Sequence, residues 1–182
     1  MPARLDVLVN GYADERVAST VTLVRDGDVV IVIDPGMVAD RGQILDPLVS
    51  LGVRPEDVTD VVLSHHHPDH TLNVALFGRA RTHDHWAIYQ GDSWTDRDAD
   101  GFALSPSVRL MATPGHTPQD ITTLVETDEG LVACTHLWWS EEGPEDDPLA
   151  SDPDELRRSR QKVLALGPVR IVPGHGAPFV PR

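Results

Sequence analysis

Hydrophobic positions along the chain predict strands and helices in turn. Short runs of apolar, largely β-branched residues are typical of buried strands, and they fall at 5–9, 17–25, 29–33, 58–63, 80–83, 108–112, 121–126, 131–135 and 169–172. Apolar residues at helical spacing predict helices over 44–51 and 72–77, and a third from Asp152 to about Leu166. Strands followed by a helix, twice over, predict an α+β fold of two packed sheets with helices outside.

Turn signals lie between these runs. Asp26-Gly27-Asp28 predicts the tight turn of a hairpin, and Gly52 is placed to end the first helix. Asp152-Pro153-Asp154-Glu155 is a strong helix start, because it offers an acidic N-cap, a proline at the first helical position and a glutamate three residues after the cap. With no internal repeat or linker, 182 residues fit one domain spanning 1–182.

The charge balance argues against a nucleic-acid partner. The net charge of -14 comes from 29 acidic and 15 basic residues, and Lys162 is the single lysine. Proteins that bind polyanions rely on clustered lysine and arginine. The one dense basic run is expected to form the solvated face of an amphipathic helix, and it consists of Arg157, Arg158, Arg160 and Lys162.

Cysteine content and hydrophobic run lengths bear on the cellular location. A lone Cys134 excludes a disulfide within the chain and suits a reducing compartment. No stretch approaches the roughly 20 apolar residues of a membrane span, and residues 1–10 lack the pattern of a secretory leader. We therefore expect a cytoplasmic protein with no membrane association.

The strongest chemical signal is the motif His65-x-His67-x-Asp69-His70, which directly follows the strand predicted at 58–63. Neutral imidazoles and a carboxylate suit zinc and its neighbours, and a loop that leaves a strand can aim several of them at one point. A lone histidine is usually a hydrogen-bonded surface or core residue. Four histidines and one aspartate within six positions instead indicate metal binding.

Two further histidines occur in a shared context. His116 ends the sequence Thr113-Pro114-Gly115-His116, and His175 ends Pro173-Gly174-His175, each after an apolar strand. Glycine allows the backbone to approach a crowded site, and proline stiffens the turn that aims the ring. Together with the first motif, they predict a site assembled from distant parts of the chain.

These motifs resemble the metallo-β-lactamase superfamily, and the resemblance runs from about Val17 to the C-terminus. It implies a four-layer αβ/βα sandwich with the metals at one edge of the two sheets. It also implies that Asp34 orients the metal loop. The implied ligands of one metal are His65, His67 and His116, and those of the second are Asp69, His70 and His175. The segment from Asp152 to Phe179 is similar to the tail of one subgroup of the family.

The chain departs from the family pattern at Thr135-His136, where family members usually have Gly-Asp and the aspartate bridges the two metals. A neutral imidazole offers one lone pair, so His136 is expected to bind one metal without bridging as a carboxylate does. The second site would then be weakened, altered in metal preference or lost. Four downstream carboxylates are alternative bridging groups, namely Glu141, Glu142, Asp146 and Asp147.

Other histidines and the tryptophans have no role that the resemblance assigns. His66 is expected to point away from its neighbours, because successive side chains of an extended segment alternate. His83 and His85 are expected in a loop, either at the surface or in contact with a substrate. The four tryptophans either pack or line the cleft, and they are Trp86, Trp94, Trp138 and Trp139.

The resemblance implies a metal-dependent hydrolase that uses Zn²⁺, as one or two ions, with Fe or Mn as alternatives. A bound metal lowers the pKa of its water to about 7, and the family places Asp69 to orient that water and accept a proton. We favour hydrolysis of an ester, thioester, lactone or related acyl bond in a small molecule. The alternatives are a phosphodiesterase or ribonuclease, a mononuclear iron dioxygenase and a non-catalytic metal-binding module.

Overall fold

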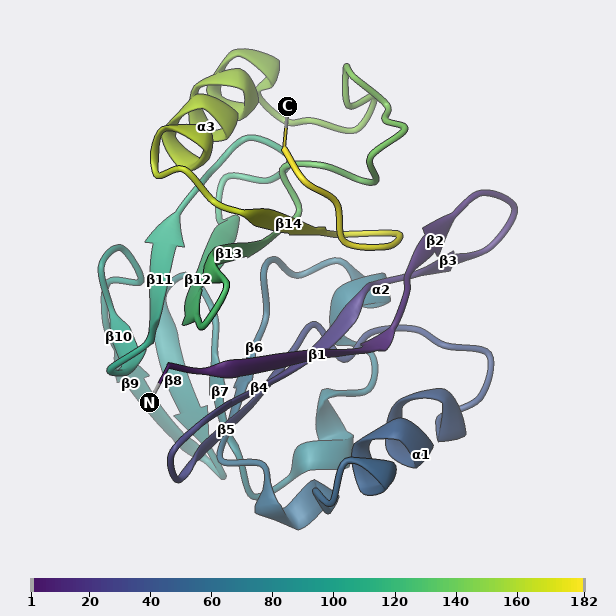
Figure 1. Ribbon diagram of the computed structural model, residues 1–182, viewed down its shortest axis with the longest axis vertical. Helices are drawn as coiled ribbons and strands as arrows, with labels where there is room; N and C mark the ends of the chain where they lie inside the picture. The colour runs from purple at the N-terminus through teal and green to yellow at the C-terminus, as the bar shows by residue number, and fades with distance from the viewer. Residues whose placement is uncertain (1, 182) are drawn as a thin grey trace.

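The computed structural model describes residues 2–181 and has two large sheets that face one another (Figure 1). The first sheet has the strand order β1-β4-β5-β6-β7-β8-β9. Its strands are β1 Arg4–Val9, β4 Val21–Asp26, β5 Val29–Ile33, β6 Asp60–Val62, β7 Arg81–His83, β8 Ala87–Gln90 and β9 Ser93–Asp96.

The second sheet has the order β10-β11-β12-β13-β14, with β10 Ala103–Ser105, β11 Val108–Ala112, β12 Ile121–Thr127, β13 Gly130–Thr135 and β14 Arg170–Pro173. A separate two-stranded hairpin is formed by β2 Tyr12–Ala13 and β3 Val17–Ala18, and it projects from the body of the fold (Figure 1). The helices are α1 Gly42–Ser50, α2 Pro68–Thr71 and α3 Pro153–Ala165, with short 3₁₀ turns η1 Pro55–Asp57 and η2 Val74–Phe77.

Alternation of side chains along the strands produces the layers. In β5, Ile31 and Ile33 face the second sheet, whereas Val32 faces the other way and packs in one cluster with Ile44 and Leu48 of α1. The hydrophobic cluster between the sheets contains residues of both sheets.

The second sheet repeats this pattern on its own outer face. In β13, Val132 and Cys134 enter the cluster between the sheets, while Ala133 packs in a third cluster with Leu156 and Val163 of α3. The layers therefore run α1, first sheet, second sheet, α3. This is the four-layer αβ/βα sandwich that the sequence predicts.

Strand direction brings several strand ends to one edge. β5, β6 and β7 are mutually parallel, as are β13 and β14, and β11 runs in the same direction as β13 because β12 is antiparallel to both. The carboxyl ends of β6, β11, β13 and β14 supply the loops that carry the histidines, and the carboxyl end of β5 supplies Asp34. The predicted hairpin between 17–25 and 29–33 also forms, with Gly27 at a φ of 62° in the turn between β4 and β5.

Several predicted elements differ in detail. The expected strand 17–25 is split into β3 and β4, because Ser19 and Thr20 give their backbone N–H groups to Asp69 O at 3.2 Å and to Gly174 O at 2.8 Å. The expected helix 72–77 is replaced by α2, which begins at Pro68, and by the turn η2. Proline is favoured at a first helical position, and this one starts a helix inside the metal motif.

The strands β8, β9 and β10 were not predicted. β9 is exposed at all four positions, and β8 and β10 are only four and three residues long. The expectation that His83 lies in a surface loop is wrong. His83 ends β7, is buried, and its Nε2 lies 2.8 Å from Asp60 Oδ1. Arg160 is also not part of a solvated face, since its guanidinium is half-buried and donates to Leu137 O at 2.7 Å.

The third helix confirms its predicted start. Asp152 is the N-cap and accepts a hydrogen bond from the Glu155 backbone N–H at 2.9 Å. Within residues 2–181, no helix combines the length and apolar character needed to cross a bilayer.

Candidate metal centre

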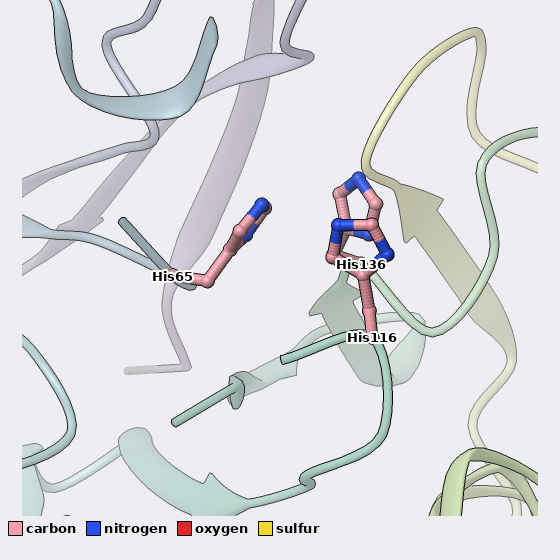
Figure 2. Close-up of side chains that lie close together, drawn as sticks. All are labelled: His65, His116 and His136. Carbon is pink, nitrogen blue, oxygen red and sulfur yellow. The ribbon is translucent and has the colours of Figure 1, made fainter. Parts of the chain in front are cut away.

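The histidines of the two motif types converge where the strands end. His65, His67 and His70 follow β6, His116 follows β11, His136 follows β13, and His175 follows β14. Figure 2 shows His65 on one side of the resulting space and His116 with His136 on the other. Six rings from four separate segments thus meet at one edge of the sandwich, as the sequence predicts.

The first predicted ligand set has the spacing of a metal site. His67 Nδ1 lies 3.0 Å from His65 Nε2 and 3.1 Å from His116 Nε2. Ligand nitrogens 2.0–2.1 Å from a tetrahedral zinc ion lie roughly 3.3 Å from one another. The three nitrogens therefore fit around one ion with small adjustments.

The second predicted set is slightly wider. Asp69 Oδ2 lies 3.4 Å from His70 Nε2 and 3.6 Å from His175 Nε2. Burial would raise the pKa of the Asp69 carboxyl, but the hydrogen bond and charge of His70 lower it to about 2. Asp69 is therefore an anion at neutral pH, as a metal-binding carboxylate must be.

Two carboxylates fix the orientation of ligand rings from the far side. His70 Nδ1 lies 2.8 Å from Asp34 Oδ2, and His116 Nδ1 lies 2.7 Å from Asp147 Oδ2. An ionised carboxylate only accepts hydrogen bonds, so each of these Nδ1 atoms carries a hydrogen and each Nε2 faces the centre of the site. This arrangement is typical of the residues that support a metal site.

Hydrogen bonds also orient the rings of His175 and His65. His175 Nδ1 donates to Ala18 O at 2.8 Å, and His65 Nδ1 lies 3.0 Å from Ser64 Oγ. Burial, followed by the charge of His70, lowers the pKa of His65 far below the usual value. The Nε2 atoms of both rings face the other histidines of the site, and neutral imidazole nitrogens suit a metal cation.

Two carboxylates favour positive charge at the second set. Burial alone would lower the pKa of His70, but the carboxylates of Asp34 and Asp69 raise it to about 9. The charge of these two carboxylates therefore favours a cation at this position. The donor set as a whole fits one or two divalent ions.

His136 lies between the two sets. One ligand atom of His136 lies within 4.8 Å of ligand atoms of His65 and His116, which form one candidate group. In a second candidate group, a ligand atom of His136 lies within 4.8 Å of those of His70 and His175. Its Nε2 lies 3.2 Å from His175 Nε2, and its buried Nδ1 has no hydrogen-bond partner among residues 2–181. It thus occupies the position between the sets where the family resemblance implies a bridging residue.

Asp34 and Asp147 hold the scaffold of the site in different ways. Asp34 has a φ of 51°, and its Oδ1 accepts the Ser64 backbone N–H at 2.7 Å, so it orients the metal loop as the resemblance implies. Asp147 was one of four carboxylates considered for bridging, but it reaches Nδ1 of His116 and not the space between the sets. No signal in the sequence distinguished Asp147 from its acidic neighbours.

Glycines allow the metal loops to pack closely. An added Cβ would lie 1.6 Å from Asp69 O at Gly36, 2.4 Å from Leu156 Cα at Gly115, and 2.3 Å from His136 Cδ2 at Gly174. Each distance is too short for any side chain. Close backbone approach therefore explains the glycines in the histidine-bearing turns.

Residues outside the two sets have clear positions. His66 points away, as predicted, with Nε2 3.0 Å from Asp84 Oδ2 and its ring 5.2 Å from that of Trp86. Trp139 lines the cleft and Trp138 packs against Phe179, so the expectation holds for these two tryptophans. Trp86 and Trp94 are instead exposed.

A cavity of about 420 Å³ opens over the metal ligands. Its floor includes Asp69 and four of the histidines, and its walls are Ala13, Asp14, Val17, Pro68, Trp139 and Leu149. The described residues that line it include no lysine or arginine. Apart from Asp14, the walls of the cavity are therefore apolar or aromatic.

A four-layer sandwich with this histidine and aspartate cluster at one edge defines a metal-binding protein of the metallo-β-lactamase type. The sequence profile of the Metallo-beta-lactamase superfamily matches residues 14–92. A Xenopus laevis protein named Metallo-beta-lactamase domain-containing protein 1 is 32% identical over 192 residues, which cover 98% of this chain and 82% of that protein. The chain belongs to the metallo-β-lactamase superfamily.

Other relatives agree on the family. The human protein of the same name is 36% identical over 157 residues, covering 82% of this chain and 59% of the human protein. The segment from Asp152 to Phe179 predicted a likeness to one subgroup of the family. These relatives, named Metallo-beta-lactamase domain-containing protein 1, confirm it. A Bacillus cereus protein named N-acyl homoserine lactonase is 28% identical over 143 residues, covering 69% of this chain and 57% of that protein.

Solved structures show the same fold. A metallo-beta-lactamase-type protein from Thermotoga maritima superposes with a TM-score of 0.77 and 22% identity, with 100% of both chains covered. An N-acyl homoserine lactone hydrolase, solved with the product N-hexanoyl-L-homoserine bound at its catalytic metal centre, superposes with a TM-score of 0.70 and 19% identity, covering 96% of this chain and 92% of that one. Membership of the superfamily supports, at that level, a metal-dependent hydrolase.

Proposed function

We propose that this protein hydrolyses an acyl bond, such as an ester, thioester or lactone, in a small molecule. The proposed ligands of the first metal are His65, His67 and His116, and those of the second are Asp69, His70 and His175. His136 is proposed to bind between them. Zinc is the proposed metal, because the donor set is dominated by neutral imidazole nitrogen.

One observation carries the proposal. The inward nitrogens and the Asp69 carboxylate form the floor of a cavity that is open to a ligand, whereas a purely structural zinc site is closed by four protein ligands. An open position at the floor of a cleft is typical of catalytic sites. The metal when bound would supply Lewis acidity and a water whose pKa is lowered to about 7.

The chain's own residues supply the rest of the chemistry. Asp69 is ionised, since its pKa is about 2, and it lines the cavity, so it can orient an attacking water and accept its proton. His116 and His175 hold their positions through the outward hydrogen bonds to Asp147 and to Ala18 O. The apolar walls exclude bulk water from the reacting bond.

The cavity favours small acyl substrates over polyanions. A nucleic acid requires basic partners for its phosphates, and the residues lining this cleft supply none. The net charge of -14 adds to that repulsion. The lactonase relative named above supports an acyl substrate but does not identify it.

A substrate panel tests the proposal. The metal-loaded protein would be assayed on activated esters, thioesters, lactones, bis(p-nitrophenyl) phosphate and single-stranded RNA, with His67→Ala as the inactive control. We expect acyl hydrolysis to exceed phosphodiester cleavage by at least tenfold. Efficient RNA cleavage with little acyl activity would support the ribonuclease alternative.

Metal content tests the remaining alternatives. Two zinc ions per chain in protein purified without chelators would favour hydrolysis. One iron ion would favour the dioxygenase alternative. Full metal content without turnover on any class of the panel would favour a non-catalytic metal-binding module.

A further inference from the structure

A second cavity, of about 320 Å³, adjoins the metal cleft. The two cavities share Ala13, Asp14, Trp139 and His175 as lining residues. The second cavity, called the side pocket below, is completed by Tyr12, Ser140, Gly143, Pro144 and Gly176. A substrate bound over the metals can therefore extend past Trp139 into this side pocket.

The side pocket combines aromatic rings with a carboxylate. Tyr12 and Trp139 both line it, and Asp14 contributes a charged group from the tip of the β2–β3 hairpin. Aromatic faces attract cations through the ring quadrupole, and a nearby carboxylate adds charge attraction. The Arg16 guanidinium lies 5.5 Å from the Tyr12 ring centroid, so a cation of the chain itself already lies against this ring and the ligand cation is assigned to Trp139. Trp139 is the ring that borders both cavities.

The charges around the side pocket also favour a cationic ligand. Its described lining residues include no lysine or arginine, and Asp14 forms no ion pair among residues 2–181. The loop 141–147, which supplies Gly143 and Pro144, carries five acidic residues. The basic residue nearest to the lining is Arg16, whose guanidinium lies against the Tyr12 ring and whose backbone N–H donates to Asp14 Oδ1 at 3.0 Å. Arg157 lies 3.9 Å from Asp146, and Arg160 donates to the backbone oxygens of Leu137 and Glu145.

We propose that the side pocket binds the cationic group of the substrate, an alkylammonium attached to the ester or thioester that is cleaved over the metals. This inference rests on the proposed function, because it assigns a substrate class to the same cleft. Asp14 and Trp139 determine the specificity. Substrates with a carboxylate or phosphate at this position are disfavoured.

A pair of ligands that differ in charge but not in shape tests binding without turnover. Choline and 3,3-dimethylbutan-1-ol are such a pair, and their affinities for the metal-loaded protein would be measured by titration of the Trp139 indole N–H signal. We expect choline to bind about tenfold more tightly, the upper range of an exposed cation–π contact assisted by a carboxylate. Equal affinities would overturn the inference.

Two variants of the β2–β3 hairpin distinguish a specific contact of Asp14 with the cation from the effect of the protein's net charge. Asp14→Asn should reduce the preference for choline to about twofold. Glu15→Gln removes the same charge one residue away, from a side chain that lines a neighbouring cavity and neither the cleft nor the side pocket, and it should leave the preference unchanged. Equal effects of the two variants would mean that the net charge, and not the side pocket, selects the cation.

A matched pair of substrates extends the test to catalysis. Acetylthiocholine and S-(3,3-dimethylbutyl) thioacetate have the same scissile bond, and kcat/KM should favour the first by about tenfold in the wild type and about twofold in Asp14→Asn. If choline binds selectively but neither thioester is cleaved, the proposed acyl hydrolysis fails and the cation site stands. If both are cleaved equally well and the two alcohols bind equally, the cation site fails and the proposed hydrolysis stands.

Discussion

Asp147 Oδ2 lies 2.7 Å from Nδ1 of His116, and both side chains are buried. Burial would raise the pKa of Asp147, but the hydrogen bond from His116 lowers it, so the pair keeps a negative charge directly behind a proposed metal ligand. Such supporting carboxylates typically contribute 10–100-fold to metal affinity. The contact therefore links an acidic surface loop to the metal centre.

The first prediction concerns this contact. Asp147→Asn keeps the shape of the side chain but removes its charge, so the affinity for the first metal should fall about tenfold in competition with a chelator. Asp146→Asn is the matched control, because Asp146 is adjacent and its side chain is 93% exposed. Equal affinities in the two variants would show that Asp147 does not support the metal.

The second prediction concerns His67. Its Nδ1 contacts the Nε2 atoms of both His65 and His116, so His67→Ala removes the central member of the first set. Metal content should fall by at least one ion per chain, and Tm should fall, because bound metal stabilises the folded state by mass action. His66→Ala serves as the control, since that ring faces Asp84. Full metal content with an unchanged Tm would contradict the ligand assignment.

The third prediction concerns His136. If His136 takes the place of a bridging carboxylate, the second metal should bind more weakly than the first. His136→Asp should tighten the second ion, and His136→Ala should leave the first largely in place, because His65, His67 and His116 remain. Calorimetric zinc titration of the three proteins measures both steps. Two equally tight ions in the wild type and in His136→Ala would show that this residue is not a ligand.

The fourth prediction concerns stability away from the metal site. Burial would raise the pKa of Asp60, but hydrogen bonds from His83, Arg81 and Thr59 hold it below its usual value of 3.8. A carboxyl whose pKa is lowered by folding stabilises the protein above its unfolded pKa, and this stabilisation is lost as the pH falls. Asp60→Asn should therefore lower the free energy of unfolding by about 2 kcal/mol at pH 7 and by progressively less below about pH 4.

Denaturant titrations across this pH range measure the effect. The exposed ion pair of Asp57 with Arg54 offers a control, because Asp57→Asn should change stability far less. A constant difference between wild type and Asp60→Asn from pH 7 to pH 3 would contradict the prediction.

The apolar strands were predictable and the polar edge strands were not. β5, β11, β12 and β13 have the short apolar runs of strands buried in a sandwich, and they lie close to their predicted bounds. β9 is exposed at all four positions, so its pairing with β8 depends on a hairpin that hydrophobicity does not reveal. Tertiary hydrogen bonds of Ser19 and Thr20 likewise divided a predicted strand.

The site was predictable where the chemistry lies within short motifs. His65, His67, Asp69 and His70 lie within six residues, and the turns before His116 and His175 marked the rest. Asp147 was not predictable as a partner of His116, because 31 residues separate them and only the folded loop brings them together. The role of His83 was hidden in the same way, since its partner Asp60 lies 23 residues earlier.

The glycines before His116 and His175 and the glycine that follows Asp34-Pro35 have a consequence for protein engineering. Alanine at Gly36, Gly115 or Gly174 would meet backbone or ring atoms at 1.6–2.4 Å, so these positions tolerate no variation even though none of them binds the metal. By contrast, Asp14 and Leu149 line the cleft from exposed positions. A library intended to change substrate preference should vary that exposed rim and keep the three glycines fixed, because the rim can be altered without moving a single metal ligand.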